Sequence, residues 1–161
     1  MSLRIGFVCL GNICRSPTAE VVTRALVDEA GLDVLVESCG TGGWHVGEPM
    51  DPRAARVLAD DGYDPSQHRA RQFGPSWFDH DLLLAMDAAN RGDVLAVLPA
   101  ERHDRVALFR SWDPEVRAGA PVPDVPDPWY GGPDGFRDVL AMVERTARAL
   151  VADLATWPGV R

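Results

Sequence analysis

The sequence predicts an α/β fold with a parallel sheet that is buried on both faces. Short, nearly continuous apolar runs alternate along the chain with longer stretches of helical periodicity, which is the order that βαβ units produce. The apolar runs contain few polar residues, and this suits strands that helices cover on both sides. The chain has 161 residues without an internal repeat or a linker, so we expect one domain over residues 1–161.

The first strand and the first helix are joined by a tight turn. Residues 3–9 are an apolar run followed by Gly11, and this pattern predicts a buried strand. A helix follows over 17–30, with Ser16 as its N-cap and Pro17 at its first position. Gly31 ends it, because glycine readily takes the left-handed conformation that closes a helix.

The remaining elements continue the alternation. In chain order, we expect a strand over 34–38, a glycine-rich loop over 40–47, a helix over 52–61, a strand over 81–86, a helix that includes 94–98, a weaker strand over 106–109 and a long amphipathic helix over 134–157. Residues 113–133 show no regular pattern and contain six prolines. Because long loops in compact domains are usually functional and prolines limit flexibility, we expect an ordered loop near a site.

Composition narrows the kinds of partner. The net charge is −8, whereas nucleic-acid binders rely on a basic surface, so we expect no nucleic-acid partner. The longest N-terminal apolar stretch, residues 5–10, is too short for a signal peptide or a membrane span. Three cysteines do not form a secreted disulfide framework. We therefore expect a cytoplasmic protein with no membrane partner; export by an unconventional route would leave no signal in the sequence.

The turn between the first strand and the first helix carries the chemistry. Residues 9–16 read Cys-Leu-Gly-Asn-Ile-Cys-Arg-Ser, and a loop that enters a helix N-terminus binds phosphate through free backbone N–H groups and the helix dipole. Arg15 can clamp two phosphate oxygens. The same donors stabilise a thiolate at Cys9, which is then placed to attack phosphorus and form a thiophosphate.

The other residues of this loop are expected to support Cys9 and Arg15. We assign phosphate binding to Leu10, Gly11, Asn12, Ile13, Cys14, Arg15 and Ser16. The Ser16 hydroxyl can stabilise the thiolate, and Asn12 can brace the loop. Cys-x5-Arg is a weak motif by itself, and the alternative is a strand–helix turn with buried cysteines and Arg15 on the surface. The preceding strand, the glycine, the following helix and Ser16 favour a phosphate loop.

Two separate motifs resemble those of the low-molecular-weight protein tyrosine phosphatases. They are Cys-Leu-Gly-Asn-Ile-Cys-Arg-Ser-Pro at residues 9–17 and Asp-Pro-Trp-Tyr-Gly at residues 127–131. Further similarity covers 43–47, 51–54, 68–72 and 86–87. The resemblance implies a three-layer sandwich with a four-stranded parallel sheet, strand order 2-1-3-4 and helices on both faces. The site would lie at the carboxyl ends of the strands.

The resemblance also implies a reaction. It is the hydrolysis of phosphotyrosine in a protein or peptide, with Cys9 as nucleophile, Arg15 as the clamp of the transition state and Asp127 as general acid. It needs no metal and no organic cofactor, and we expect inorganic phosphate or other oxyanions to inhibit it. Asp124 lies on the same loop, and spacing alone does not choose between the two aspartates; the family pattern selects Asp127.

Four residues are expected to line a slot for an aryl ring, namely Trp44, His45, Trp129 and Tyr130. A deep slot suits phosphotyrosine better than the shorter phosphoserine. Trp129 departs from the family, which usually has Tyr at this position; Trp keeps an aromatic wall but lacks the hydroxyl. The alternative for the three large aromatic residues is ordinary packing.

His68 and Asp87 receive supporting roles from the resemblance. His68 would support the phosphate loop through Ser16 or Asn12, and Asp87 would hold Arg15 or groups of the loop. The alternatives are an ordinary loop histidine and an N-cap for the helix that follows Asp87.

The remaining cysteines bear on regulation and on rival reactions. The resemblance suggests a reversible disulfide between Cys14 and Cys9 after oxidation, with a small buried side chain as the alternative for Cys14. Cys39 is expected in the core. Thiol-dependent arsenate reduction is one rival reaction, but it needs a distal pair of cysteines. Arginine dephosphorylation is another, and related enzymes with that activity have Thr where Ile13 stands.

Overall fold

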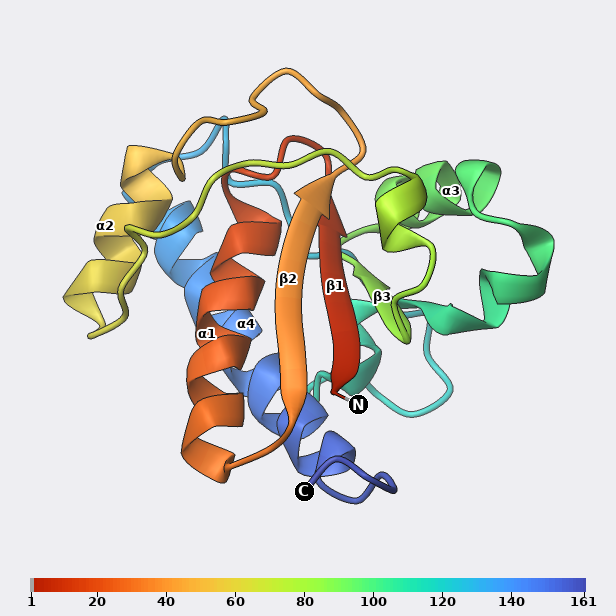
Figure 1. Cartoon of the computed structure of the whole chain (residues 1–161). Helices are drawn as coiled ribbons and strands as arrows, with labels where there is room; N and C mark the ends of the chain where they lie inside the picture. Colours follow the sequence, from red (N-terminus) through yellow and green to blue (C-terminus); the bar gives the residue numbers. More distant parts are fainter. Residues whose placement is uncertain (1) are drawn as a thin grey trace.

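Four parallel strands form the sheet in the computed structural model, which describes residues 2–161. The strands are β1 (Leu3–Cys9), β2 (Val34–Gly40), β3 (Leu82–Ala85) and β4 (Val106–Leu108). Their order in the sheet is β2-β1-β3-β4, with β1 and β3 in the middle (Figure 1). This confirms the predicted fold class and strand order.

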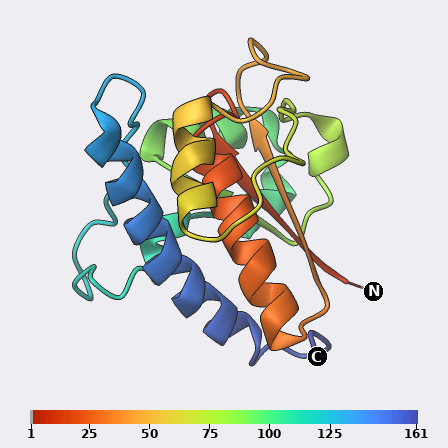
Figure 2. The same ribbon diagram turned by 90° about the vertical axis from the view of Figure 1, so that its left-hand side faces the viewer.

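Helices cover both faces of this sheet. The helices are α1 (Arg15–Ala30), α2 (Pro52–Asp60), α3 (Ala88–Val97) and α4 (Pro133–Leu154). Helices α1, α2 and α4 lie together on one side of the sheet, and α3 lies on the other (Figures 1 and 2). Three short 3₁₀ segments, Pro75–Trp77, Ala100–Arg105 and Phe109–Trp112, complete the connections. The arrangement is the three-layer sandwich that the sequence predicts.

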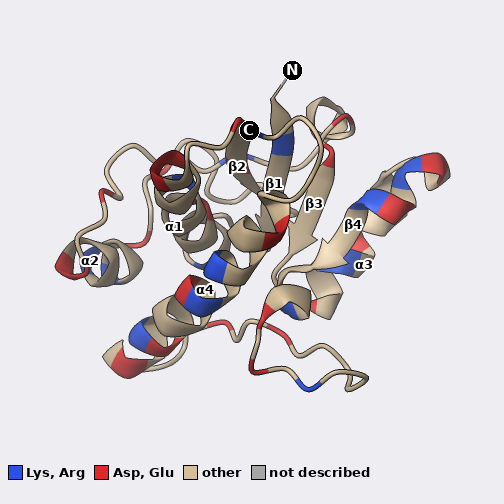
Figure 3. Ribbon diagram, turned by 90° about the horizontal axis from the view of Figure 1, so that it is seen from below, with Lys and Arg blue, Asp and Glu red and all other residues tan. Residues whose placement is uncertain are grey.

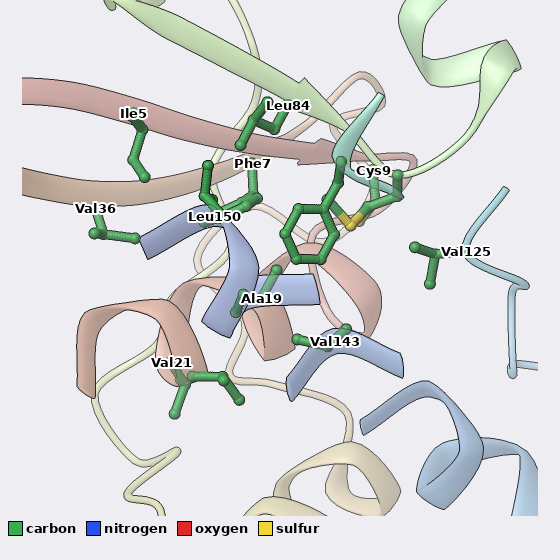
Figure 4. Close-up of a cluster of buried hydrophobic side chains, with 14 of the residues drawn as sticks. Ile5, Phe7, Cys9, Ala19, Val21, Val36, Leu84, Val125, Val143 and Leu150 are labelled. Atoms are coloured by element: carbon green, nitrogen blue, oxygen red, sulfur yellow. The ribbon is translucent and has the colours of Figure 1, made fainter. Parts of the chain in front are cut away.

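The strands carry apolar side chains on both faces because each face supports its own hydrophobic cluster. Ile5, Phe7 and Leu84 belong to the larger cluster, which joins the sheet to α1 and α4 (Figure 4). Val8 and Leu83 point the other way and belong to a smaller cluster around Trp77 and Val94. Neighbouring residues of a strand alternate between faces, so burial on both sides produces the continuous apolar runs in the sequence.

The prediction for the start of the first helix is wrong by two residues. Helix α1 begins at Arg15, and Cys14, not Ser16, is its N-cap. Ser16 instead lies in the first turn, where its hydroxyl is 2.9 Å from the Cys9 sulfur. The start of α1 therefore has no side-chain cap, and the Ser16 hydroxyl contacts Cys9 instead. At the other end, Gly31 closes the helix with φ = 67°, as predicted.

The predicted helix around 94–98 is the second half of a longer one. Helix α3 starts at Ala88, directly after Asp87, whose side chain accepts from the Asn90 backbone N–H. Other predicted ends differ by one to three residues: β2 extends to Gly40, and α4 stops at Leu154. Such shifts reflect local hydrogen bonding that periodicity does not record.

The proline-rich segment contains neither helix nor strand between Asp113 and the start of α4, as predicted. Two buried residues attach it. Asp113 forms ion pairs with Arg110 at 3.0 Å and with Arg145 of α4 at 2.9 Å. The Val125 backbone N–H donates to the Met86 carbonyl, 2.7 Å away, just beyond β3. Contacts of Asp113 and Val125 with the rest of the domain therefore hold the segment in place at its start and in its middle.

Acidic and basic residues are interspersed along α4 (Figure 3). Among them, Arg137 pairs with Asp134 and Arg148 pairs with Glu144 along the helix. The opposite side of the helix is buried against the sheet. No helix within residues 2–161 is both long and apolar enough to cross a membrane.

We predict that Asp113→Asn lowers the free energy of unfolding by about 2–3 kcal/mol at pH 7, because two arginines lose their buried partner. Burial alone would raise the pKa of Asp113, but hydrogen bonds from Arg145, from the Glu115 backbone and from Arg110 outweigh it and lower that pKa. Its stabilising effect is therefore complete above the unfolded pKa, near pH 4, and is lost below it.

Urea denaturation of both proteins between pH 7 and pH 3 tests this expectation. The difference between wild type and Asp113→Asn should narrow as the pH falls below about 4. Asp138→Asn, an exposed change on α4, serves as the control and should stay within about 0.5 kcal/mol of wild type. A difference for Asp113→Asn that stays constant with pH would contradict the account.

Candidate active site

The site starts where β1 ends. Cys9 is the last residue of the strand and is buried at the edge of the main hydrophobic cluster (Figure 4). Its sulfur accepts a hydrogen bond from the Asn12 backbone N–H at 3.3 Å. Asn12 has φ = 58°, a left-handed conformation that L-residues other than glycine seldom adopt. The left-handed turn directs this N–H toward the sulfur.

The Asn12 side chain holds that turn in place. Its amide donates to Ser16 Oγ at 2.8 Å and to Ser38 Oγ at 2.9 Å, and its carbonyl oxygen accepts from the Arg71 backbone N–H at 2.9 Å. The His68 ring donates through Nε2 to the Asn12 backbone carbonyl at 2.7 Å. Asn12 is fully buried, and these bonds satisfy its polar groups, which is the condition for burying them.

Ser16 is oriented by the same network. Because the Asn12 amide donates to Ser16 Oγ, the hydroxyl proton is free to donate to the Cys9 sulfur at 2.9 Å or to the Cys39 carbonyl at 3.4 Å. The loop also requires a glycine beside it: a Cβ on Gly40 would lie 2.7 Å from the Leu10 carbonyl oxygen.

Arg15 lies almost fully buried beneath the cavity, with 4% of its surface exposed. It donates through Nη1 to Asp87 at 2.6 Å and to the Val125 carbonyl at 3.0 Å, and Nη2 is 4.0 Å from Asp127. Burial opposes its charge, but the Asp87 hydrogen bond and the nearby Cys9 and acidic groups raise the pKa of Arg15.

Asp87 fulfils both functions considered for it. One carboxylate oxygen accepts from Arg15, and the other caps α3 by accepting from the Asn90 N–H at 2.7 Å. The two interpretations of the sequence are therefore compatible.

The two candidate acids occupy different places. Asp127 lines a cavity of about 160 Å³ together with Cys9 and Arg15. Asp124 is absent from this lining and accepts from the Ala88 N–H at 2.9 Å, which places it at the start of α3. Asp127 is also partly exposed, with 44% of its side chain accessible, as a group that meets a substrate must be.

The four residues expected around the slot all line this cavity. With the loop residues 9–15 and Asp127, its lining consists of Trp44, His45, Trp129 and Tyr130. Trp44 is 71% exposed and Tyr130 is 94% exposed, so packing in the core does not account for them. The His45 and Trp129 rings lie 6.2 Å apart between centroids. The cavity therefore has a polar, cationic floor and an aromatic rim.

The other two cysteines are free and buried. Burial, with Asp51 and Cys9 nearby, raises the pKa of Cys14, so its thiol stays protonated at neutral pH. Cys39 belongs to the small cluster on the other face of the sheet. Within residues 2–161, no group of three His, Cys, Asp or Glu side chains is placed to hold a metal ion.

Several residues at the site have no role assigned from the sequence. Ser38 and Arg71 hold Asn12, the Val125 carbonyl holds Arg15, and Asp51 and Arg53 connect the phosphate loop to the loop of Asp127. The sequence Asp-Pro-Arg at 51–53 carries a usable signal, because an N-cap aspartate before proline marks a helix start. Nothing in local sequence marks the others.

Comparisons with known proteins agree with this geometry. The family model for low molecular weight phosphotyrosine protein phosphatase matches residues 4–157. The low molecular weight protein-tyrosine-phosphatase of Streptomyces coelicolor is 54% identical over 156 residues, which are 94% of this chain and 93% of that protein. Low molecular weight protein-tyrosine phosphatase A of Mycobacterium tuberculosis is 46% identical over 144 residues, 88% of this chain and 85% of that protein.

Solved structures show the same relationship. A crystal structure of the protein tyrosine phosphatase of Entamoeba histolytica, with Hepes in its active site, superposes with a TM-score of 0.88 at 31% identity. The match covers 96% of this chain and 97% of the other. The chain therefore belongs to the low molecular weight phosphotyrosine protein phosphatase family.

Proposed function

We propose that this chain, working as one domain, hydrolyses phosphotyrosine in proteins through a covalent phosphate on Cys9. One observation carries the proposal: a buried cysteine sulfur, an almost fully buried guanidinium and a partly exposed carboxyl group line one small cavity. A binding module would need the cation and the backbone donors but neither the nucleophile nor the acid. The three groups together match a two-step phosphoryl transfer.

In the first step, the Cys9 thiolate attacks phosphorus as the bond from phosphorus to the tyrosine oxygen breaks. Arg15 and the backbone N–H groups of the loop stabilise the charge on the three equatorial oxygens. Asp127 gives its proton to the departing phenolate oxygen. The products are neutral tyrosine, ionised Asp127 and phosphocysteine.

In the second step, water attacks the phosphorus of phosphocysteine. Asp127 takes a proton from this water, the sulfur–phosphorus bond breaks, and inorganic phosphate leaves. Cys9 returns to the thiolate, which the Asn12 N–H and the Ser16 hydroxyl stabilise. His68 supports this arrangement through its hydrogen bond to the Asn12 backbone carbonyl. The cycle uses no group outside the chain except water.

The shape of the cavity supports an aryl substrate. Trp44, His45, Trp129 and Tyr130 stand around a floor made by the phosphate loop, and aromatic walls favour a flat ring. We expect phosphotyrosine to be preferred over phosphoserine, whose side chain is shorter. Free phosphate and similar oxyanions fit the floor and compete with substrate. We place this activity in the cytoplasm, where the three free thiols remain reduced.

The rival reactions are not favoured. Arsenate reduction by a thiol relay needs a distal pair of cysteines, whereas the sequence has one cysteine beyond the loop, Cys39, and it lies on the opposite face of the sheet. Arginine dephosphorylation finds no support in the relatives above, which carry the name tyrosine phosphatase. Ile13 lines the cavity where the arginine-specific enzymes have a hydroxyl.

We also propose that Cys14 protects the nucleophile: peroxide oxidises the Cys9 thiolate to a sulfenic acid, and the Cys14 thiol then displaces water from that sulfur to form a Cys9–Cys14 disulfide. Both cysteines are free, and both line the same cavity. The raised pKa of Cys14 slows this reaction, because the attacking species is the thiolate.

Substrate preference tests the proposed function directly. Without added metal, a phosphotyrosine peptide should be hydrolysed, while the matched phosphoserine and phosphoarginine peptides and arsenate with thioredoxin should give little turnover. Cys9→Ser should lower kcat by about 10³-fold or more, since the nucleophile is lost. Cys39→Ala, a second buried cysteine, is the control and should keep wild-type kcat. Metal-independent activity on phosphotyrosine that survives in Cys9→Ser would contradict the proposal.

The pH–rate profile tests the acid. Asp127→Ala should lower kcat/KM for phenyl phosphate by about 10²–10⁴-fold and should abolish the decline of the rate at alkaline pH, which reports loss of the acid's proton. Asp124→Ala should keep this decline, because Asp124 lies at the start of α3. If only Asp124→Ala loses it, the assignment of the acid is wrong.

A further inference from the structure

Arg53 stands between the two loops that make the active site. It follows Asp51, whose backbone N–H donates to the carbonyl of Ile13 in the phosphate loop at 2.9 Å. The carboxylate of Asp51 is buried and accepts from Arg53 Nε at 3.1 Å and from Nη2 at 2.9 Å. Two bonds from one guanidinium to one carboxylate fix its plane. Arg53 is therefore held rigidly relative to the phosphate loop.

The free nitrogen of that guanidinium reaches the proline-rich loop. Arg53 Nη1 donates to the Trp129 carbonyl at 3.1 Å, and the guanidinium carbon lies 5.1 Å from the centre of the Trp129 ring. The same guanidinium carbon lies 4.6 Å from the centre of the Phe136 ring in α4. The Trp129 N–H in turn donates to Asp127 Oδ1 at 3.1 Å. One arginine thus connects the phosphate loop to the residue that orients Asp127.

We propose that Arg53 is a positioning residue that sets the distance between the general acid and the phosphate loop. The proposal rests on the proposed function, in which Asp127 is the acid. The loop around Asp127 has no helix or strand of its own, so its geometry depends on such contacts. Arg53 fixes the loop after Asp127, as the Arg15 bond to the Val125 carbonyl fixes it before Asp127.

This role predicts a specific kinetic signature. A general acid must lie within hydrogen-bond distance of the oxygen that it protonates. Phenyl phosphate releases a phenol with a pKa of about 10, like that of tyrosine, and depends on this proton. 2,4-Dinitrophenyl phosphate releases a stable anion and does not. Loss of Arg53 should therefore slow the first substrate and spare the second.

The test compares kcat/KM for these two substrates in Arg53→Met, Arg53→Lys and Asp127→Ala. Arg53→Met should lower the value for phenyl phosphate by about 10- to 100-fold, part of the 10²–10⁴-fold that an acid supplies, and the value for 2,4-dinitrophenyl phosphate by less than about threefold. Arg53→Lys keeps the charge but not the two-bond geometry, so it should recover only part of the loss. The alkaline decline of the rate should weaken in the same order.

Arg56→Met is the matched control. Arg56 lies one turn further along α2 and lines the same outer cavity as Arg53 and Phe136, but it is not among the donors to Trp129 within the described residues. It should behave as wild type with both substrates. Activity on 2,4-dinitrophenyl phosphate also reports whether each variant is folded, so a misfolded protein is not mistaken for a misplaced acid.

The outcomes separate this inference from the proposed function. If Asp127→Ala shows the selective loss and Arg53→Met does not, Arg53 has no positioning role. An equal loss with both substrates in Arg53→Met would also overturn it, because the effect would then lie in the phosphate loop. If Asp127→Ala itself shows no selective loss, the assignment of the acid fails, and the inference fails with it.

Discussion

The buried positive charge of Arg15 is the constraint on which the active site depends. Moving a guanidinium from water into a protein costs several kcal/mol unless partners compensate for it. Here Asp87, the Val125 carbonyl and Asp127 surround it. These partners come from the β3–α3 junction and from the proline-rich loop. The need to compensate the buried charge of Arg15 therefore brings these distant segments to the end of β1.

A second requirement follows from the shape of the loop. The left-handed turn at Asn12 costs about 1 kcal/mol relative to an ordinary conformation, and it persists because hydrogen bonds satisfy every polar group of that side chain. Ser38 and Arg71 supply two of those bonds from outside the loop, and His68 donates to the Asn12 backbone carbonyl. The donors therefore need little reorganisation when charge develops on phosphate. Local geometry thus allows a chain with a net charge of −8 to bind an anion.

The sequence alone predicts features that depend on neighbouring residues, but it does not predict contacts between residues far apart in the chain. The pattern of residues 9–16 predicts the end of a strand, a turn and a helix N-terminus, and this arrangement predicts a phosphate loop. Asp124 and Asp127 look equivalent along the chain, but Asp124 accepts from the Ala88 N–H at the start of α3, whereas Asp127 lines the cavity. The pattern Ser-Pro predicts an N-cap at Ser16, whereas Ser16 lies inside the helix and contacts the Cys9 sulfur. Arg53 lacks a local signal for its role because its partner, Trp129, is 76 residues away.

The most direct test of the account is to detect the phosphate on its nucleophile. 2,4-Dinitrophenyl phosphate needs no proton from Asp127 in the first step, whereas Asp127→Ala should still slow the attack of water in the second step, so the intermediate should accumulate during turnover of this substrate. Rapid denaturation followed by ³¹P NMR and peptide mass spectrometry should find a thiophosphate at Cys9, with up to about one phosphate per chain. Phosphate on another residue, or turnover by Asp127→Ala with no covalent phosphate at any point of a quench series, would contradict the central claim that Cys9 attacks phosphorus.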